Sequence, residues 1–417
     1  MIIQRPHYLN QLIALRHNGL IKIVTGIRRC GKSFLLSTLY AGWLKEQGVS
    51  HDHIIDINLE DRRNKSLRDP DNLLAFIDSK IKDDDMHYIM IDEIQLVPEF
   101  EDVLNSYLNM PNADVYVTGS NARFLSSNVR TEFAGRGDEI KLHPLSFSEF
   151  SSTRDGDKTL NLREYMIFGG MPQVVLRNTE IEKSEVLKAL FQRTYIRDIV
   201  ERYNIKNTDV LDELLNIVAS STGGLTNPTK LCNTFESVRH EKVNRMTITS
   251  YLNYLCESFL IEKSNQYDIK GKRYIDSPYK YYFSDCGLRN ARLNFRQIEF
   301  THLLENVIYN ELLIRGFNVD VGVVSKQMRT DDGNRIRRNY EVDFVCNQGS
   351  RRYYIQSAYK MIDEDKVSQE KASLKNIDDS FKKTIILGES TPVIRDEYGI
   401  TIISIYDFLL NENSLDW

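Results

Sequence analysis

Residues 26–33 have the sequence Gly26-Ile27-Arg28-Arg29-Cys30-Gly31-Lys32-Ser33, which matches the pattern G-x-x-x-x-G-K-[ST] at every fixed position. This pattern is typical of a loop that binds phosphate groups. The β-branched, apolar residues 21–25 predict a buried strand before it, and the apolar residues 34–40 predict the first turns of a helix after it. Because the motif requires a strand, a loop and a helix in this order, we interpret residues 26–33 as a nucleotide-binding loop.

The chemistry of the motif predicts which groups would contact a nucleotide. Gly26 and Gly31 allow a tight backbone path that points N–H groups at phosphate oxygens, and the following helix adds the positive end of its dipole. Lys32 is expected to contact the β- and γ-phosphates, and the Ser33 hydroxyl is expected to bind Mg²⁺. The predicted nucleotide contacts are Gly26, Ile27, Arg28, Arg29, Cys30, Gly31, Lys32, Ser33 and Phe34.

A pair of carboxylates, Asp92 and Glu93, follows the apolar stretch 87–91, which predicts another strand. This arrangement has the form of a Walker B strand. Asp92 would hold the water shell of Mg²⁺, and Glu93 would orient or deprotonate the attacking water. We therefore predict Ser33 and Asp92 as metal ligands and Lys32 and Glu93 as catalytic residues.

Further strands are predicted at residues 53–58 and 114–121, and the second of these ends in small polar residues. Ligands collect at the carboxyl ends of parallel strands, so Ser120, with Thr118 or Asn121, is a candidate sensor of the γ-phosphate. An ordinary turn is the alternative. The alternation of strands with helices predicts an α/β fold with a parallel sheet covered on both faces.

Arg136 lies between two glycines, just before a fifth predicted strand. Phosphoryl transfer benefits from an arginine that neutralises charge in the transition state, supplied by the same subunit or by a neighbour. Arg136 is our candidate for this catalytic role. A structural salt bridge is the alternative.

An ordered series of motifs resembles the archaeal-type AAA-related P-loop ATPases of bacteria and archaea. The motifs are Gly-Ile-Arg-Arg-x-Gly-Lys-Ser, Ile-Asp-Glu-Ile-Gln, Thr-Gly-Ser, Ala-Gly-Arg, Pro144-Leu-Ser-Phe147 with Glu149-Phe150, Phe168-Gly-Gly-Met-Pro172, Tyr195-Ile-Arg-Asp198, Lys280-Tyr-Tyr-Phe283, Asp285-Cys-Gly-Leu288 and Leu304-Glu305-Asn306. The resemblance therefore covers nearly the whole chain. It implies that the nucleotide is ATP.

The resemblance also implies a division of the chain into four parts. They are a P-loop ATPase core at residues 1–145, a helical lid at 146–207, a winged helix at 208–295, and a C-terminal α/β domain at 296–417 that resembles a restriction-endonuclease fold. In the lid segment, Arg193 and Arg197 are four residues apart on one helix face and would point either toward nucleotide or into solvent.

The predicted winged helix consists of three helices and a hairpin, a variant of the helix-turn-helix. Residues 227–283 contain nine Lys and Arg against six Asp and Glu, a local excess of positive charge in an acidic chain. This excess favours contact with DNA phosphates. Packing between subunits is the alternative. The expected phosphate contacts are Lys230, Lys242, Arg245, Lys270, Lys272 and Arg273.

The C-terminal domain has an incomplete nuclease motif. An endonuclease of the PD-(D/E)-x-K type needs an Asp on one strand and (D/E)-x-Lys on the next. Asp343 matches the first position and Glu305 is a candidate helix carboxylate, but Gln356 replaces the second acid and Ala358 replaces the lysine. We therefore expect no nuclease activity. Residues 326–360 contain eight Lys and Arg against four acids, and the stretch 329–338 is either a basic hairpin arm or a solvated loop.

Composition limits the class of protein. A chain of 417 residues with 41% hydrophobic residues is expected to form two or three domains, and its net charge of −5 excludes a globally basic nucleic-acid binder. Five scattered cysteines argue against a zinc site or a disulfide framework and favour a reducing, cytoplasmic setting. No stretch has the roughly 20 apolar residues of a membrane span.

Two functions remain open. The first is an AAA-type ATPase that assembles as a homo-oligomeric ring and acts on DNA as a motor, helicase or branch-migration enzyme. The second is a nucleotide-dependent switch or scaffold that controls a protein partner in stress response or defence. Ring assembly follows from the resemblance rather than from any interface visible in the sequence.

Overall fold

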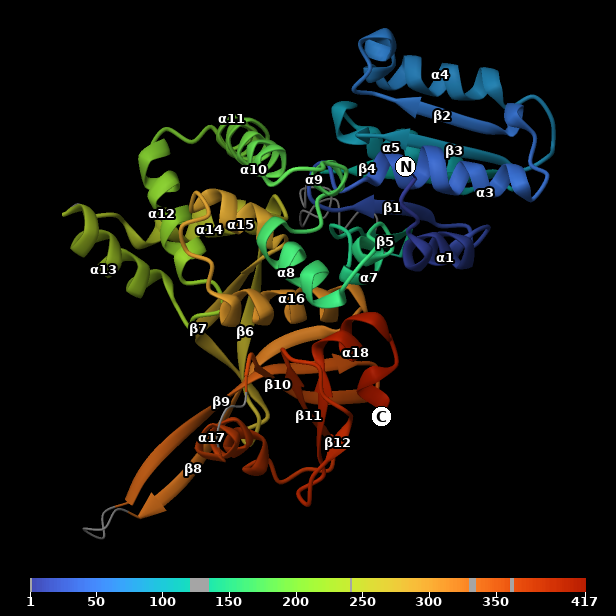
Figure 1. The fold of residues 1–417 in the computed structure, drawn as a ribbon. Coiled ribbons are helices and arrows are strands. Elements are labelled where there is room, and N and C mark those ends of the chain that lie inside the picture. Colours follow the sequence, from blue (N-terminus) through green and yellow to red (C-terminus); the bar gives the residue numbers. More distant parts are fainter. Residues whose placement is uncertain (1, 121–134, 241, 330–334, 361–363) are drawn as a thin grey trace. The chain divides into compact units, whose positions relative to one another are not determined.

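The computed structural model describes residues 2–120, 135–240, 242–329, 335–360 and 364–417 (Figure 1). The chain forms two compact units, which we describe separately. Unit 1 comprises residues 1–144 with 257–259, and unit 2 comprises residues 145–256 and 260–417. In the described part of the chain, no helix combines the length and the apolar character needed to cross a membrane.

Unit 1 contains a five-stranded sheet in the order β2-β3-β4-β1-β5, and every neighbouring pair is parallel. The predicted α/β fold with a parallel sheet is therefore confirmed. Every residue of β1 and β3 is buried, as expected for strands covered on both faces. The strands are β1 (Ile21–Thr25), β2 (Ile54–Asn58), β3 (His87–Asp92), β4 (Ala113–Gly119) and β5 (Gly137–Lys141).

Helices cover this sheet. The helix after the phosphate loop runs without a break through α2 (Lys32–Phe34), the π-helical η1 (Leu35–Tyr40) and α3 (Ala41–Glu46). The predicted helix at 34–40 is thus present as part of a longer one. Within the described residues, the other helices of the unit are α1 (Pro6–Leu15), η2 (His51–His53), η3 (Arg62–Arg68), α4 (Pro70–Lys80), η4 (Ile94–Leu96) and α5 (Phe100–Leu108).

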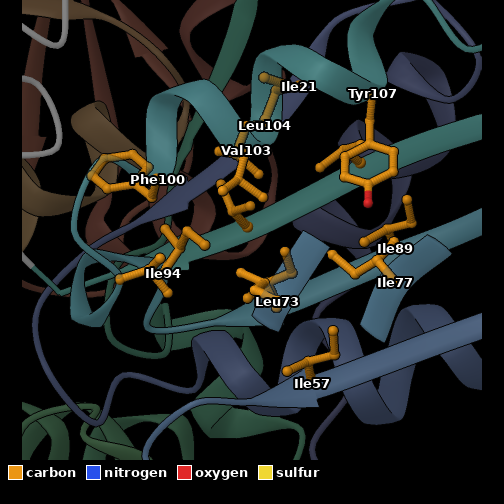
Figure 2. Packing of buried hydrophobic residues seen from close by; sticks show 14 of the residues in the cluster. Ile21, Ile57, Leu73, Ile77, Ile89, Ile94, Phe100, Val103, Leu104 and Tyr107 are labelled. Atoms are coloured by element: carbon orange, nitrogen blue, oxygen red, sulfur yellow. The ribbon is translucent and has the colours of Figure 1, made fainter. Parts of the chain in front are cut away.

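One hydrophobic core cluster of unit 1 lies where α4 and α5 pack on the sheet (Figure 2). Leu73 and Ile77 of α4 and Leu104 of α5 are fully buried against Ile89 and other strand residues. Burying each such side chain contributes about 1.5–3 kcal/mol relative to leaving it in water. This packing holds the strands in the positions that bring their carboxyl ends together.

Unit 2 begins with a helical segment, as expected for the predicted lid at residues 146–207. Its helices are α7 (Phe147–Ser151), α8 (Lys158–Phe168), α9 (Pro172–Val175), α10 (Glu180–Ala189), the π-helical η6 (Leu190–Ile196) and α11 (Arg197–Arg202). Arg197 is exposed and pairs with Glu201, which favours the solvated alternative for this residue.

The glycines at 169–170 and 287 are required by close contacts around Asp285. The Asp285 carboxylate accepts hydrogen bonds from the backbone N–H groups of Gly170, at 2.7 Å, and of Leu288, at 2.9 Å. A Cβ atom on Gly169 would lie 2.1 Å from the Asp285 Oδ1, and a Cβ atom on Gly287 would lie 2.1 Å from the carbonyl oxygen of Phe168. Burial raises the pKa of Asp285 to about 6, although these backbone donors oppose the shift.

The second sheet has eight strands in the order β12-β13-β11-β10-β9-β8-β6-β7. The strands are β6 (Ile261–Asp268), β7 (Arg273–Phe283), β8 (Asn318–Arg329), β9 (Arg335–Gln348), β10 (Arg351–Ala358), β11 (Lys382–Leu387), β12 (Ile394–Arg395) and β13 (Ile400–Ser404). The remaining helices are α12 (Thr208–Ser220), α13 (Pro228–Arg239), α14 (Arg245–Glu257), α15 (Cys286–Arg292), α16 (Phe300–Ile314), α17 (Glu364–Lys375), α18 (Ile405–Leu410) and η7 (Ser414–Asp416).

The hairpin of β6 and β7 is part of this sheet and is not a separate wing. The three helices α12, α13 and α14 precede it in the predicted order, and Asn227 caps α13 by accepting a hydrogen bond from the Lys230 N–H. However, β6 pairs in parallel with β8 through residues 266–268 and 321–323. The four-part division of the sequence stays a prediction, and its third and fourth parts share one sheet.

A long hairpin extends from the second sheet (Figure 1). The strands β8 and β9 stay paired as far as Arg329 and Arg335. Of the two alternatives for this basic stretch, the described residues therefore form a hairpin arm. The side chains of Lys326, Arg329, Arg337 and Arg338 are exposed.

Candidate nucleotide-binding site

The phosphate loop connects the carboxyl end of β1 to the helix that begins at Lys32. Three of its residues have positive φ angles: Gly26 at 141°, Arg29 at 65° and Gly31 at 107°. A Cβ atom on Gly26 would lie 2.1 Å from the carbonyl oxygen of Leu142, so the loop packs directly against the chain that follows β5. Both the backbone conformation and this contact exclude a side chain at position 26.

Lys32 is buried and reaches across its own loop. Its Nζ donates hydrogen bonds to the carbonyl oxygens of Gly26, at 3.0 Å, and of Ile27, at 3.2 Å. Gly31 precedes the helix and provides no side-chain cap for its first N–H groups. The loop therefore holds an ammonium group beside an uncapped helix N-terminus, which is a suitable environment for phosphate oxygens.

The Ser33 hydroxyl contacts the Asp92 carboxylate, donating to Oδ1 and Oδ2 at 2.8 Å each. Asp92 is the last residue of β3. Its Oδ1 also accepts a hydrogen bond of 2.6 Å from the Thr118 hydroxyl of β4. The structure thus brings together the two predicted metal ligands, and Thr118 orients one of them. Asn121, the other alternative to Ser120, lies outside the described residues.

Glu93 lies next to this group, with its backbone in the left-handed region at a φ of 56°. Its backbone N–H donates to the Thr118 hydroxyl at 2.9 Å, and its Oε2 accepts hydrogen bonds from Ser120, at 3.0 Å, and from Gln95. Burial raises the pKa of Glu93, Lys32 opposes the shift, and Asp92 adds to it. Ser120 therefore holds the predicted catalytic carboxylate.

These residues fit a nucleotide with Mg²⁺. A hydroxyl and a carboxylate are oxygen ligands of the kind that Mg²⁺ prefers, and the lysine and the helix N-terminus match the charge of phosphates. The other predicted contacts vary in exposure. Ile27 and Cys30 are buried, Arg28 pairs with Glu60 at 2.6 Å, and Phe34 is 38% exposed.

Two residues of this site were missed by sequence reasoning. Arg5 is buried and donates hydrogen bonds to the carbonyl oxygens of Cys30, at 3.3 Å, and His143, at 2.9 Å, which ties the phosphate loop to the chain after β5. No local pattern marks an arginine so far from the loop. Gln95 belongs to the Ile-Asp-Glu-Ile-Gln motif, and its position two residues after Glu93 is the available signal.

Arg136 lies at the amino ends of the parallel strands, whereas the phosphate loop lies at their carboxyl ends. It directly precedes β5, and its carbonyl oxygen accepts a hydrogen bond from the N–H of Ile21, the first residue of β1. The phosphate loop follows the last residue of β1, roughly 13 Å further along the strand. The Arg136 side chain donates to Asn105 at 3.3 Å. In this structure the Arg136 side chain therefore lies away from the phosphate loop of its own subunit.

A second cluster of charged residues lies in unit 2, around the incomplete nuclease motif. Lys280 of β7 is buried, and its Nζ lies 2.7 Å from Glu305 Oε1, 2.7 Å from Glu341 Oε1 and 3.9 Å from Asp343 Oδ1. The predicted residues Glu305 and Asp343 are therefore brought together. Between them lies a lysine from a strand that sequence reasoning had assigned to the winged helix.

The charges in this cluster compensate each other. Burial alone would lower the pKa of Lys280, but the carboxylates of Glu305, Asp343 and Glu341 outweigh it and raise this pKa. Burial and the neighbouring Glu305 raise the pKa of Asp343 well above its usual range. Gln356 lies on the other side of Asp343, with its Oε1 3.4 Å from the Asp343 backbone nitrogen. Lys280 is thus the cation that these carboxylates share.

The parallel sheet, the phosphate loop and the paired Ser33 and Asp92 define a P-loop protein of the AAA type. Comparison with known families agrees: the family described as "AAA domain" matches residues 18–151, and a domain of unknown function matches residues 159–299. The predicted class is confirmed. The resemblance of residues 296–417 to a nuclease fold stays a prediction.

The chain belongs to the same family as an uncharacterized protein of Haemophilus influenzae, with 33% identity over 98% of this chain and 99% of that protein. An uncharacterized protein of Methanocaldococcus jannaschii is 30% identical over 86% of this chain and 79% of that protein. Among solved structures, the Aeropyrum pernix Orc1 protein in complex with DNA matches with 10% identity and a TM-score of 0.31, over 70% of this chain and 93% of that one.

The Lys280 cluster predicts a large and pH-dependent effect of removing the lysine. We expect Lys280→Met to destabilise the protein by about 3–5 kcal/mol at neutral pH, because it leaves buried carboxylates without their cation. Burial and the neighbouring Glu305 already raise the folded-state pKa of Asp343, so the loss should shrink as the pH falls and should be smallest below about 4, where this carboxyl is protonated in both states. Urea denaturation at several pH values measures this effect.

Lys272→Met is the matched control, because Lys272 belongs to the same hairpin and is exposed. It should change the unfolding midpoint little. An equal loss of stability in both variants, or a loss in Lys280→Met that is the same at every pH, would contradict the assignment of Lys280 as the shared cation.

Proposed function

We propose that the chain is a Mg²⁺-dependent ATPase of AAA type that assembles as a homo-oligomeric ring and acts on DNA. The observation that carries the ATPase part is the contact of Ser33 with Asp92, directly beside Glu93 and Lys32, at one edge of the sheet. This is the set of groups that direct attack of water on a γ-phosphate needs.

The residues of the site have distinct roles in this mechanism. Lys32 and the loop N–H groups bind the phosphates, and Ser33 with Asp92 would hold Mg²⁺, which supplies positive charge to the phosphate oxygens. Glu93 orients the water and accepts its proton at the carboxylate. Ser120 and Gln95 fix the Glu93 carboxylate by hydrogen bonds, and Ser120 is the candidate sensor of the γ-phosphate.

The position of Arg136 supports assembly. The residue lies at the sheet edge away from the nucleotide site of its own subunit, so a catalytic role requires a neighbour. We propose that Arg136 of one subunit supplies positive charge to the site of the next. A closed ring satisfies every such interface with one type of contact.

The DNA partner is supported by the charge of the β8–β9 arm. Four exposed basic residues belong to its two paired strands: Lys326, Arg329, Arg337 and Arg338. Three more lie at the turn of the neighbouring β6–β7 hairpin: Lys270, Lys272 and Arg273. Lys270 pairs with Asp378 at 2.9 Å and lowers the pKa of that carboxylate, and the charge of Lys326 adds to this shift. A basic surface on two hairpins suits the DNA backbone.

The alternative is a nucleotide-dependent switch that controls a protein partner. One observation favours it: the β6–β7 hairpin is built into a sheet, so a free wing is not available to enter a DNA groove. An ATPase rate that is insensitive to single-stranded, duplex and branched DNA would support the switch.

Substitution of the proposed base tests hydrolysis. We expect Glu93→Gln to lower the ATPase kcat by about 100-fold or more while ATP binding persists, because the amide orients water but cannot accept its proton. Exposed Glu99, a few residues further on, provides the control Glu99→Gln, which should keep the wild-type rate. The rates are measured by phosphate release, and binding by a fluorescent nucleotide. A full rate in Glu93→Gln would contradict the mechanism.

The pH dependence of the wild-type rate is a second readout of the same residue. Glu93 must be ionised to act as a base, and burial raises its pKa above the ordinary 4.5 of a glutamate. The rate should therefore fall, on acidification, at a pH above that ordinary value. An acid limb at or below 4.5 would contradict this assignment.

Mixing two inactive variants tests the role of Arg136. Arg136→Ala and Glu93→Gln should each be inactive alone. In a random mixture, about a quarter of interfaces pair an intact Glu93 with an intact Arg136 from the neighbour, so activity should reappear if the arginine acts between subunits. Steady-state ATPase assays of the mixture measure it. A mixture as inactive as its components would contradict the role across the interface.

Removal of charge from the β8–β9 arm tests the DNA partner. We expect the triple substitution of Arg329, Arg337 and Arg338 by Gln to abolish stimulation of the ATPase by DNA and to lower the slope of log K against log salt by about 0.9 for each lost phosphate contact. The control replaces three exposed basic residues of unit 2 outside the arm, Lys158, Arg177 and Lys188, by Gln. Equal effects of both triple variants would contradict a specific arm.

A further inference from the structure

A group of two histidines and one aspartate lies in unit 1, outside the nucleotide-binding site. His53 directly precedes β2, His87 is the first residue of β3, and Asp83 belongs to the loop before β3. One ligand atom from each of the three side chains lies within 4.8 Å of the other two. Among the described residues, this is the cluster whose side chains approach closely enough to hold a metal ion.

His87 is oriented as a metal ligand. Its side chain is 1% exposed, and its Nδ1 lies 2.7 Å from the carbonyl oxygen of Asp85. A carbonyl oxygen only accepts, so Nδ1 carries a proton, and in the neutral ring Nε2 has a free lone pair. Within the described ranges, Nε2 is buried without a hydrogen-bond partner and faces Asp83 Oδ1 at 3.9 Å. A buried lone pair that faces a carboxylate oxygen calls for a cation between them.

The other two side chains complete the group. His53 Nε2 lies 3.1 Å from Asp83 Oδ2, and the rings of His53 and His87 are in edge contact with centroids 4.7 Å apart. Asp83 is positioned by its own loop, since its Oδ1 accepts a hydrogen bond from the Asp85 N–H at 3.1 Å. With half of the Asp83 side chain exposed, a water molecule has access to a fourth coordination position.

We propose that His53, Asp83 and His87 bind a divalent transition-metal ion, with Zn²⁺ as the best match. Two imidazole nitrogens and one carboxylate form a donor set suited to Zn²⁺, whereas Mg²⁺ and Ca²⁺ select oxygen ligands. Zn–N bonds of about 2.0–2.1 Å place tetrahedral ligands roughly 3.3 Å apart, which small side-chain rotations would reach from the present spacing. The hydrogen bond from Nδ1 of His87 to Asp85 is the outer contact that usually fixes a metal-bound histidine.

The site is separate from the nucleotide-binding site. His87 and Asp92 are the first and last residues of β3, roughly 16 Å apart. A metal ion here would join the start of β2, the edge strand of the sheet, to the start of β3. Its role is therefore to hold this edge strand in place, independently of ATP hydrolysis.

Metal titration of the tag-free protein tests the proposal. The full chain is stripped with a chelator and titrated with Zn²⁺ by calorimetry, without nucleotide and with a phosphine reductant. We expect one ion per chain. Titration with Co²⁺ should produce visible d–d bands of a tetrahedral site without a sulfur-to-cobalt band, which separates this site from the cysteines.

Matched variants locate the site. His53→Gln and Asp83→Asn should each weaken Zn²⁺ binding by more than about tenfold, since even loss of an outer-shell contact costs that much. The controls are the exposed neighbours, His51→Gln and Asp84→Asn, which should bind Zn²⁺ like the wild type. All four variants change exposed or partly exposed side chains, and their thermal unfolding without metal confirms that they fold.

Several results would overturn the proposal. They are failure of the wild type to take up one ion per chain, a cobalt spectrum with thiolate bands, or binding that survives both His53→Gln and Asp83→Asn. Equal weakening by His51→Gln would overturn it too. Because no step uses ATP, the result does not depend on whether the chain hydrolyses ATP.

Discussion

The nucleotide-binding site depends on one constraint: parallel strands end at the same edge of their sheet. β1, β3 and β4 are neighbours or near neighbours in this sheet, and each ends in a residue or loop that carries chemistry. The Ser33 hydroxyl, the Asp92 carboxylate and the Thr118 hydroxyl meet there within hydrogen-bond distance, although they lie far apart in the sequence. Backbone pairing of β4 with β1 and with β3 sets the register of these strands, and the packing of α4 and α5 buries apolar side chains of the sheet.

Buried lysines are compensated in two different ways in this molecule. Lys32 is held by carbonyl oxygens of its own loop, which are neutral, so its charge stays available for phosphate. Lys280 is held by carboxylates, so its charge is used within the fold. The same chemical group thus supports binding in one place and stability in the other, because the surrounding acceptors differ in charge.

The two glycine motifs of unit 2 have a structural explanation that their sequences alone do not provide. Gly169 and Gly287 are far apart in the chain, but each leaves space for the other's segment around the Asp285 carboxylate. That carboxylate accepts backbone N–H groups from both segments and is buried. A change at either glycine would therefore disturb the same contact, which links two motifs that sequence analysis could only record separately.

Local patterns were enough for the elements and for much of the site. The β-branched run before Gly26 and the apolar run before Asp92 predicted buried strands because hydrophobic periodicity depends on neighbouring residues only. The phosphate loop and its lysine, serine and aspartate followed from fixed spacing. By contrast, four features depended on tertiary structure. They are the position of Arg136 at the amino ends of the strands, the sharing of one sheet by β6 and β8, the lysine between Glu305 and Asp343, and the cluster of His53, Asp83 and His87. These contacts join residues distant in sequence, and their geometry is set by strand order and packing, which no local spacing encodes.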